Sequence, residues 1–157
     1  MLGGSMLRKE IFVVTILFGT LWAYGFGQSA APGLQQELIA ADRGIWEAIA
    51  GPHPDIGKVS AALAPDYIDI DSGVRHPREE VLDYLRGLTN FSFQYEHVRG
   101  YVLSPTSGYV IAELRYSSVQ KGTAAAGKVL TTTVFSKERG RWLAHLHTEM
   151  DMKAETR

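Results

Sequence analysis

The chain has 157 residues, and its 16 Lys and Arg residues nearly balance its 17 Asp and Glu residues. The basic residues are scattered singly, so the concentrated basic face typical of nucleic-acid-binding proteins is missing. The absence of cysteine excludes disulfides, thiolate nucleophiles and cysteine-ligated zinc sites. Hydrophobic residues make up 45% of the chain, which is enough for a folded core of one domain.

The N-terminal segment has the three parts of a secretory signal. Arg8 and Lys9 precede an apolar run over residues 11–23, and the small-residue stretch GQSAAPG follows this run. We expect residues 1–31 to be removed on export, which predicts a secreted or periplasmic protein.

Two alternatives concern this segment. Met6 is a second candidate start, which would make residues 1–5 an upstream extension. An uncleaved membrane anchor is the other alternative, but the apolar run is shorter than the roughly 20 residues that a spanning helix needs. The mature protein is expected to be one domain, residues 32–157, without a membrane contact.

Two helices are predicted at the start of this domain. Apolar residues recur at helical spacing over residues 34–49, and Gly51 stands where a glycine commonly ends a helix. A shorter helix is predicted over residues 56–64, because Asp55 is a good N-cap residue directly before it.

The apolar period then changes. Residues 67–71 alternate strictly between apolar and polar, which predicts a short strand, and Ser72-Gly73 is a turn signal. A third helix is predicted to open at Pro77 and to end at Gly87, with acidic residues in its first turn, where the helix dipole favours them.

The rest of the chain is rich in β-branched and aromatic residues and predicts long strands. Breaks are expected at residues 105–108, 121–127 and 138–140. Helices segregated from a run of strands indicate an α+β fold, with three N-terminal helices packed on a strongly curved, mainly antiparallel sheet around a hollow. The predicted long strands are residues 91–103, 109–119, 128–137 and 141–150.

Four stretches resemble one superfamily in their order along the chain: ADRGIWEAI, LAPDYIDIDSG, HPREEVLDYL and RGRWLAHLHTE. They are similar to the nuclear transport factor 2-like superfamily, in its branch of unknown function. The superfamily also includes ketosteroid isomerase, polyketide cyclases and scytalone dehydratase. The resemblance spans about residues 34–150 and implies a cone-shaped fold with a deep pocket, often in a dimer packed through the sheet.

The resemblance places Asp71 at the position of the general base of ketosteroid isomerase. A carboxylate in the pocket could remove a proton beside a carbonyl if burial raised its pKa. The alternative is that Asp71 only stabilises the turn before Ser72 and Gly73. Asp69 lies two residues earlier, hence on the same strand face.

The isomerase pattern is incomplete elsewhere. Trp46 lies near the position of the oxyanion-hole tyrosine, and Thr133 lies near that of the second donor, a protonated aspartate. Without these donors, enolate stabilisation would lose several kcal/mol, which argues against ketosteroid isomerase activity. Both residues are expected to contact a ligand.

His145 and His147 lie two apart on a predicted strand and are therefore expected on one face. The motif is similar to the His-x-His of the calcium/calmodulin-dependent kinase association domain. With Glu149, the pair could bind a divalent metal, or one histidine could form an acid–base pair with a carboxylate. Alternatively, both histidines lie at the surface or in a dimer contact.

His97 shares the parity of an aromatic row that contains Phe93 and Tyr95. This row predicts a wall of the pocket or core, with His97 as its polar member. We expect at least one of His97, His145 and His147 to share the pocket with Asp71.

The primary prediction is a binding domain for a small molecule that is apolar or of mixed polarity, without a cofactor or metal. One alternative is a cofactor-independent lyase or isomerase that uses Asp71 as base with a pocket histidine. The other is an oligomerisation domain. A homodimer is expected, and a nucleic-acid partner is not.

Overall fold

The computed structural model describes residues 32–152 of the chain. The expected signal segment, residues 1–31, lies outside the described residues. Within residues 32–152, no helix has both the length and the apolar composition needed to cross a membrane.

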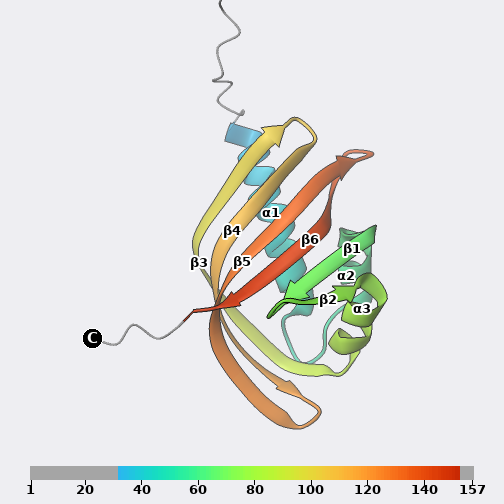
Figure 1. The fold of residues 1–157 in the computed structure, drawn as a ribbon, viewed down its shortest axis with the longest axis vertical. Coiled ribbons are helices and arrows are strands. Elements are labelled where there is room, and N and C mark those ends of the chain that lie inside the picture. Colours follow the sequence, from blue (N-terminus) through green and yellow to red (C-terminus); the bar gives the residue numbers. More distant parts are fainter. Residues whose placement is uncertain (1–31, 153–157) are drawn as a thin grey trace, which may run out of the picture.

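The elements follow one another in a mixed order (Figure 1). They are α1 (Pro32–Ile49), α2 (Ile56–Ala62), β1 (Leu63–Asp71), β2 (Val74–Pro77), α3 (Arg78–Arg86), β3 (Leu88–Ser104), β4 (Ser107–Gln120), β5 (Thr123–Glu138) and β6 (Arg141–Asp151).

The strands form one six-stranded sheet in the order β2-β1-β6-β5-β4-β3. Neighbouring strands are antiparallel, apart from the parallel pair β1 and β6. The long strands bend strongly, α1 lies along one face of them, and α2 and α3 lie beside β1 and β2 (Figure 1). The predicted α+β class with a curved, mainly antiparallel sheet is therefore confirmed.

Two predicted boundaries are wrong. The second helix ends at Ala62, because the backbone of Leu63 is already extended, and β1 begins there rather than at residue 67. The expected break over residues 121–127 is a two-residue turn followed at once by β5, whose small residues pair with β4. Small side chains had suggested a loop, but the ladder needs only their backbone groups.

The turn at Ser72-Gly73 is confirmed, although the short strand β2 after it was not predicted. Both turn residues have positive φ angles, 51° and 82°. Two-residue turns with this backbone match the twist of the strands they join, and a glycine adopts it without steric cost. The turn therefore folds β2 back onto the end of β1.

Close packing of α1 on the sheet requires a glycine. A Cβ atom on Gly108 of β4 would lie 2.7 Å from Leu38 Cδ2 and 2.6 Å from the Tyr101 carbonyl oxygen. Leu38 is completely buried in this contact. The glycine thus lets α1 approach the sheet closely enough to present its next turn, including Asp42, to the interior.

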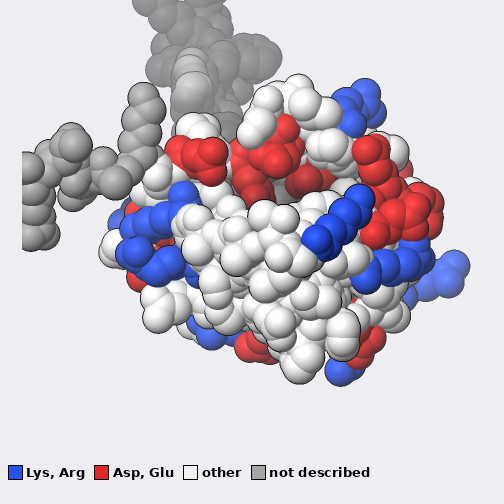
Figure 2. Space-filling view, turned by 90° about the horizontal axis from the view of Figure 1, so that it is seen from below, with Lys and Arg blue, Asp and Glu red and all other residues white. Residues whose placement is uncertain are grey.

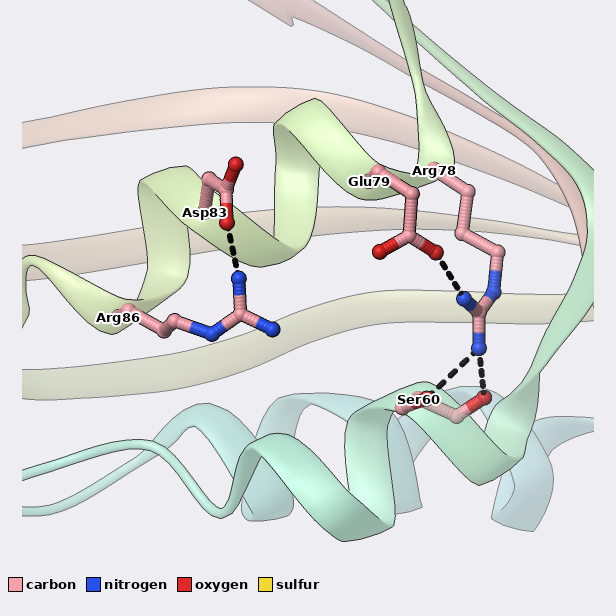
Figure 3. A network of polar contacts seen from close by, with 5 residues as sticks. All are labelled: Ser60, Arg78, Glu79, Asp83 and Arg86. Atoms are coloured by element: carbon pink, nitrogen blue, oxygen red, sulfur yellow. Dashed lines mark hydrogen bonds and ion pairs between the residues drawn. The ribbon is translucent and has the colours of Figure 1, made fainter.

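α3 is attached to α2 by a polar contact at its first residue (Figure 3). The Arg78 guanidinium donates to the Ser60 carbonyl oxygen at 2.9 Å and to Ser60 Oγ at 2.6 Å, and it also pairs with Glu79. The acidic first turn of this helix was predicted and is confirmed. With α3 held in this way, Leu82 and Leu85 are buried.

β-bulges interrupt the long strands at several points, and two of them involve histidines. In β3, one extra residue lies between Glu96 and Arg99, and His97 there has a φ angle of 47°. In β6, Ala144 and Leu146 pair with neighbouring residues of β5, which leaves His145 as the extra residue. A bulge shifts the inward and outward alternation of every residue after it.

Candidate functional site

A cavity of about 440 Å³ lies between the curved sheet and the helices. Its apolar wall includes Trp46 and Ile49 of α1. The ring of Phe91 also lines the cavity and stacks on that of Trp46, with 6.1 Å between the two ring centroids. Polar side chains from α1, β1, β5 and β6 converge on the same space. The central ones are Asp42, Asp69, Thr133, His147 and Glu149.

His147 contacts two polar side chains and is only 7% exposed. Its Nδ1 lies 2.9 Å from Thr133 Oγ1, and its Nε2 lies 3.2 Å from Glu149 Oε1. Burial alone would lower the pKa of His147, but the Glu149 hydrogen bond and the charges of Glu149, Asp69 and Asp42 outweigh it, so this pKa is raised. The imidazole can therefore keep a proton inside the cavity.

Asp42 of α1 is almost completely buried, with 1% exposure. Burial raises its pKa, against the opposing effects of the Thr133 and Tyr95 hydroxyls and of His147. The Tyr95 hydroxyl donates a hydrogen bond to Asp42 Oδ2. Burial and this carboxylate together raise the pKa of Tyr95, which makes Tyr95 a donor and not a base.

Asp69 lies beside His147, because the two residues are paired in the parallel ladder of β1 and β6. Burial raises the pKa of Asp69, and the charge of His147 opposes this rise. Its Oδ1 atom is buried and has no hydrogen-bond partner among the described residues. Leaving a buried acceptor unpaired costs about 1–3 kcal/mol, so this oxygen is available to a donor in the cavity.

Asp71 lines the cavity but is exposed, so its expected burial is wrong. It is the last residue of β1, directly before the turn, and it accepts a hydrogen bond from Ser72 Oγ at 2.9 Å. The expected common face of Asp69 and Asp71 is confirmed, since both line the cavity. Asp69 lies two residues earlier on β1 and is less exposed, and burial raises its pKa.

One predicted histidine shares the cavity with Asp71, and it is His147. His97 does not line the cavity; its side chain is 75% exposed and its Nδ1 lies 3.1 Å from Glu113. The predicted place of His97 in the aromatic row is wrong because the β3 bulge turns this residue outward.

His145 also lies outside the cavity, so its expected common face with His147 is wrong. The bulge at His145 breaks the alternation between the two histidines. Two hydrogen bonds hold the His145 ring. Its Nδ1 lies 2.8 Å from Asp66 Oδ1, and its Nε2 lies 2.7 Å from Ser136 Oγ. None of these three residues lines the cavity.

Trp46 and Thr133 line the cavity as expected, whereas Phe93 and Tyr95 do not. Side chains of α1 cover these two residues, since Trp46 packs against the Phe93 ring and Asp42 binds the Tyr95 hydroxyl. Phe93 and Tyr95 therefore support cavity residues from behind instead of contacting a ligand.

Asp42 was missed, although the sequence contains a signal for it. It lies four residues after Leu38 and four before Trp46, on the buried stripe of α1. An ionisable residue on an apolar helix face is a candidate for a buried functional group. The rim residues His76, Tyr84 and Tyr116 carry no comparable signal, because the curvature of the sheet and the place of α3 bring them to the cavity.

One group of side chains has the spacing of metal ligands: Glu96, His97 and Glu113 lie within 4.8 Å of one another. The Lys128 ammonium already lies 3.4 Å from Glu96, and it also pairs with Glu113. This lysine neutralises the carboxylates at the β3 bulge, and the group does not line the cavity.

No protein-family model and no curated protein sequence matches the chain. Solved structures do match its fold. A nuclear transport factor 2-like (NTF2-like) protein of unknown function in nutrient uptake from Rhodospirillum rubrum is 14% identical, with 74% of this chain and 98% of that chain covered and a TM-score of 0.68.

Two further solved structures show the range of proteins with this fold. A ketosteroid isomerase-like protein from Erwinia carotovora atroseptica is 12% identical over 79% of this chain and 100% of that chain, with a TM-score of 0.62. The association domain of C. elegans CaMKII is 14% identical over 73% of this chain and 92% of that chain, with a TM-score of 0.61. The chain therefore has the NTF2-like cone fold that the sequence resemblance implied.

Proposed function

We propose that the protein binds a small organic molecule in the cavity between α1, α3 and the curved sheet. The volume of about 440 Å³ lies within the range of small-molecule sites. The observation that carries the proposal is the convergence of three ionisable groups, the buried Asp42 and His147 and the half-buried Asp69, on one largely apolar space. Buried ionisable groups are costly, and they concentrate at functional sites.

The fold alone does not choose this function. The similar structures are named for nutrient uptake, for ketosteroid isomerase and for a kinase association domain, and one fold supports all three. The proposal therefore rests on the lining of the cavity.

Binding is tested by calorimetric titration of the purified protein with a library of small aromatic and mixed-polarity compounds. Ser118 lines the cavity, whereas its neighbour Ser117 is exposed on the opposite face of β4. Ser118→Leu should fill part of the cavity and weaken binding by about tenfold or more, while Ser117→Leu should leave it unchanged. Equal effects of the two substitutions, with both variants folded, would place the ligand elsewhere.

A second candidate function is proton transfer, which the pairing of Asp69 with His147 favours. Asp69 offers an unpartnered carboxylate oxygen, and the raised pKa of His147 favours its protonated form, which can donate a proton. Such a pair can remove a proton beside a carbonyl and return one elsewhere on the substrate, as in an isomerase or lyase. In this proposal Asp69 is the base, and the exposed Asp71 helps to orient the substrate at the mouth.

Export and self-assembly complete the proposal. The N-terminal signal pattern supports action in the periplasm or outside the cell. Exposed apolar side chains support a homodimer: Tyr101, whose ring stacks on that of Tyr109, is 37% exposed, and Leu103 is 69% exposed. Light scattering on the purified protein measures its oligomeric state, and N-terminal sequencing of the exported protein locates the cleavage site.

A further inference from the structure

Acidic groups dominate the charged residues around the cavity. Its only basic residues among those described are histidines, His76 and His147, and no Lys or Arg of residues 32–152 lines it. The whole chain is nearly neutral, so this excess is local. Figure 2 shows acidic side chains gathered in and around a hollow on one face of the molecule. The carboxylates that line the cavity are Asp42, Asp69, Asp71, Glu80 and Glu149.

Only some of these carboxylates have a histidine or tyrosine partner within the protein. Glu149 contacts His147 at 3.2 Å, Glu80 contacts His76 at 3.2 Å, and Asp42 accepts the Tyr95 hydrogen bond. With both histidines protonated, the five carboxylates would still outnumber the cations.

The remaining pair, Asp69 and Asp71, faces no cationic partner within hydrogen-bond distance among the described residues. Asp71 has the Ser72 hydroxyl, and the Oδ1 atom of Asp69 has no partner within residues 32–152. An unpaired, buried carboxylate oxygen in a cavity needs a hydrogen-bond donor, and a charged donor forms the stronger bond.

We propose that the ligand of this cavity carries a protonated amine on an apolar or aromatic body, with the amine at Asp69. This inference rests on the proposed binding function and specifies the class of the ligand. The rings of Trp46, Phe91, Tyr84 and Tyr116 line the same space and suit both the apolar body and a cation above a ring face. An anionic ligand would meet like charges that no Lys or Arg of the lining offsets.

The test compares three probes that share one ring system and differ in charge: 2-(1-naphthyl)ethylamine, 2-(1-naphthyl)ethanol and 1-naphthylacetate. Each is titrated calorimetrically into the full chain at neutral pH. The amine should bind about tenfold or more tightly than the alcohol, and the acetate should bind most weakly. Tighter binding of the acetate or the alcohol would overturn the inference while leaving the proposed function intact.

The residue assignment is tested with matched variants on one strand. Asp69→Asn keeps the shape and removes the charge, whereas Asp66→Asn changes an exposed carboxylate of β1 that contacts His145 and does not line the cavity. We expect Asp69→Asn to remove most of the preference for the amine over the alcohol and Asp66→Asn to keep it. An unchanged preference in Asp69→Asn would overturn the assignment, and no binding of any probe or library compound would refute the proposed function as well.

Discussion

Two histidines on β6 are separated by one residue and lie on different sides of the sheet. His147 is buried in the cavity against Thr133 and Glu149, whereas His145 contacts Asp66 and Ser136 outside it. Both rings have two polar partners, so hydrogen bonding alone does not distinguish them. The difference is the cavity, which leaves the surroundings of His147 open to a ligand and gives His145 a purely structural environment.

A single extra residue produces this separation. Without the bulge, strict alternation would place both histidines on one face. With His145 as the bulged residue, Ala144 and His147 both line the cavity. The candidate site therefore depends on backbone register as much as on residue type.

The largest effect expected from this comparison is on ligand affinity. His147→Gln removes a cationic group beside Asp69 and frees the Glu149 carboxylate, so affinity for the naphthyl amine should rise by about tenfold, because the amine no longer meets the like charge of the imidazolium. His145→Gln should change affinity by less than about twofold. Calorimetric titration with the naphthyl amine measures both, and equal changes in the two variants would contradict the division of roles.

Two tyrosines of β3 also differ in their surroundings, since Tyr95 contacts a buried carboxyl group and Tyr101 is exposed. Tyr95→Phe removes the hydrogen bond that the Tyr95 hydroxyl donates to the buried Asp42 carboxyl and should lower the free energy of unfolding by about 2 kcal/mol. Tyr101→Phe changes an exposed ring and should alter it by less than about 0.5 kcal/mol. Urea unfolding measures both values. A stable Tyr95→Phe variant would mean that Asp42 does not depend on this hydrogen bond.

The fold was predictable because its signals are local and repeated. Apolar spacing located α1, and the turn at Ser72-Gly73 followed from a residue pair that tolerates positive φ angles. The resemblance added the cone shape, which no local pattern contains.

The site was less predictable, for two physical reasons. The sequence around His97 and His145 carries no signal for a bulge, because bulges are set by the pairing of the strands. The prediction that side chains alternate strictly between the two faces was therefore wrong at both residues. Burial also depends on the place of a residue in the assembled fold, which is why Asp71 ends at the exposed mouth and Asp69 does not. Asp42 alone could have been found earlier, from its place on the apolar stripe of α1.

The smallest predicted effect is the pH dependence of stability, and it distinguishes His147 by its pKa. Because this pKa is raised in the folded state, folding favours the protonated imidazole. The stabilisation is fully present below the unfolded pKa of about 6.5 and is lost as the pH rises through the higher folded value. The His147→Gln variant lacks this contribution.

The free energy of unfolding of the natural protein, relative to that of His147→Gln, should therefore decrease as the pH rises above about 6.5. Urea unfolding at a series of pH values measures the difference. The raised pKa values of Asp42 and Asp69 act in the same direction, since protonated buried carboxyls favour the folded state and lose this advantage as they ionise. Both residues remain in the variant, so most of their contribution cancels in the difference. A difference that stays constant over this range would mean that the surrounding carboxylates do not stabilise the imidazolium, and His147 would then be a neutral hydrogen-bonding residue of the cavity wall.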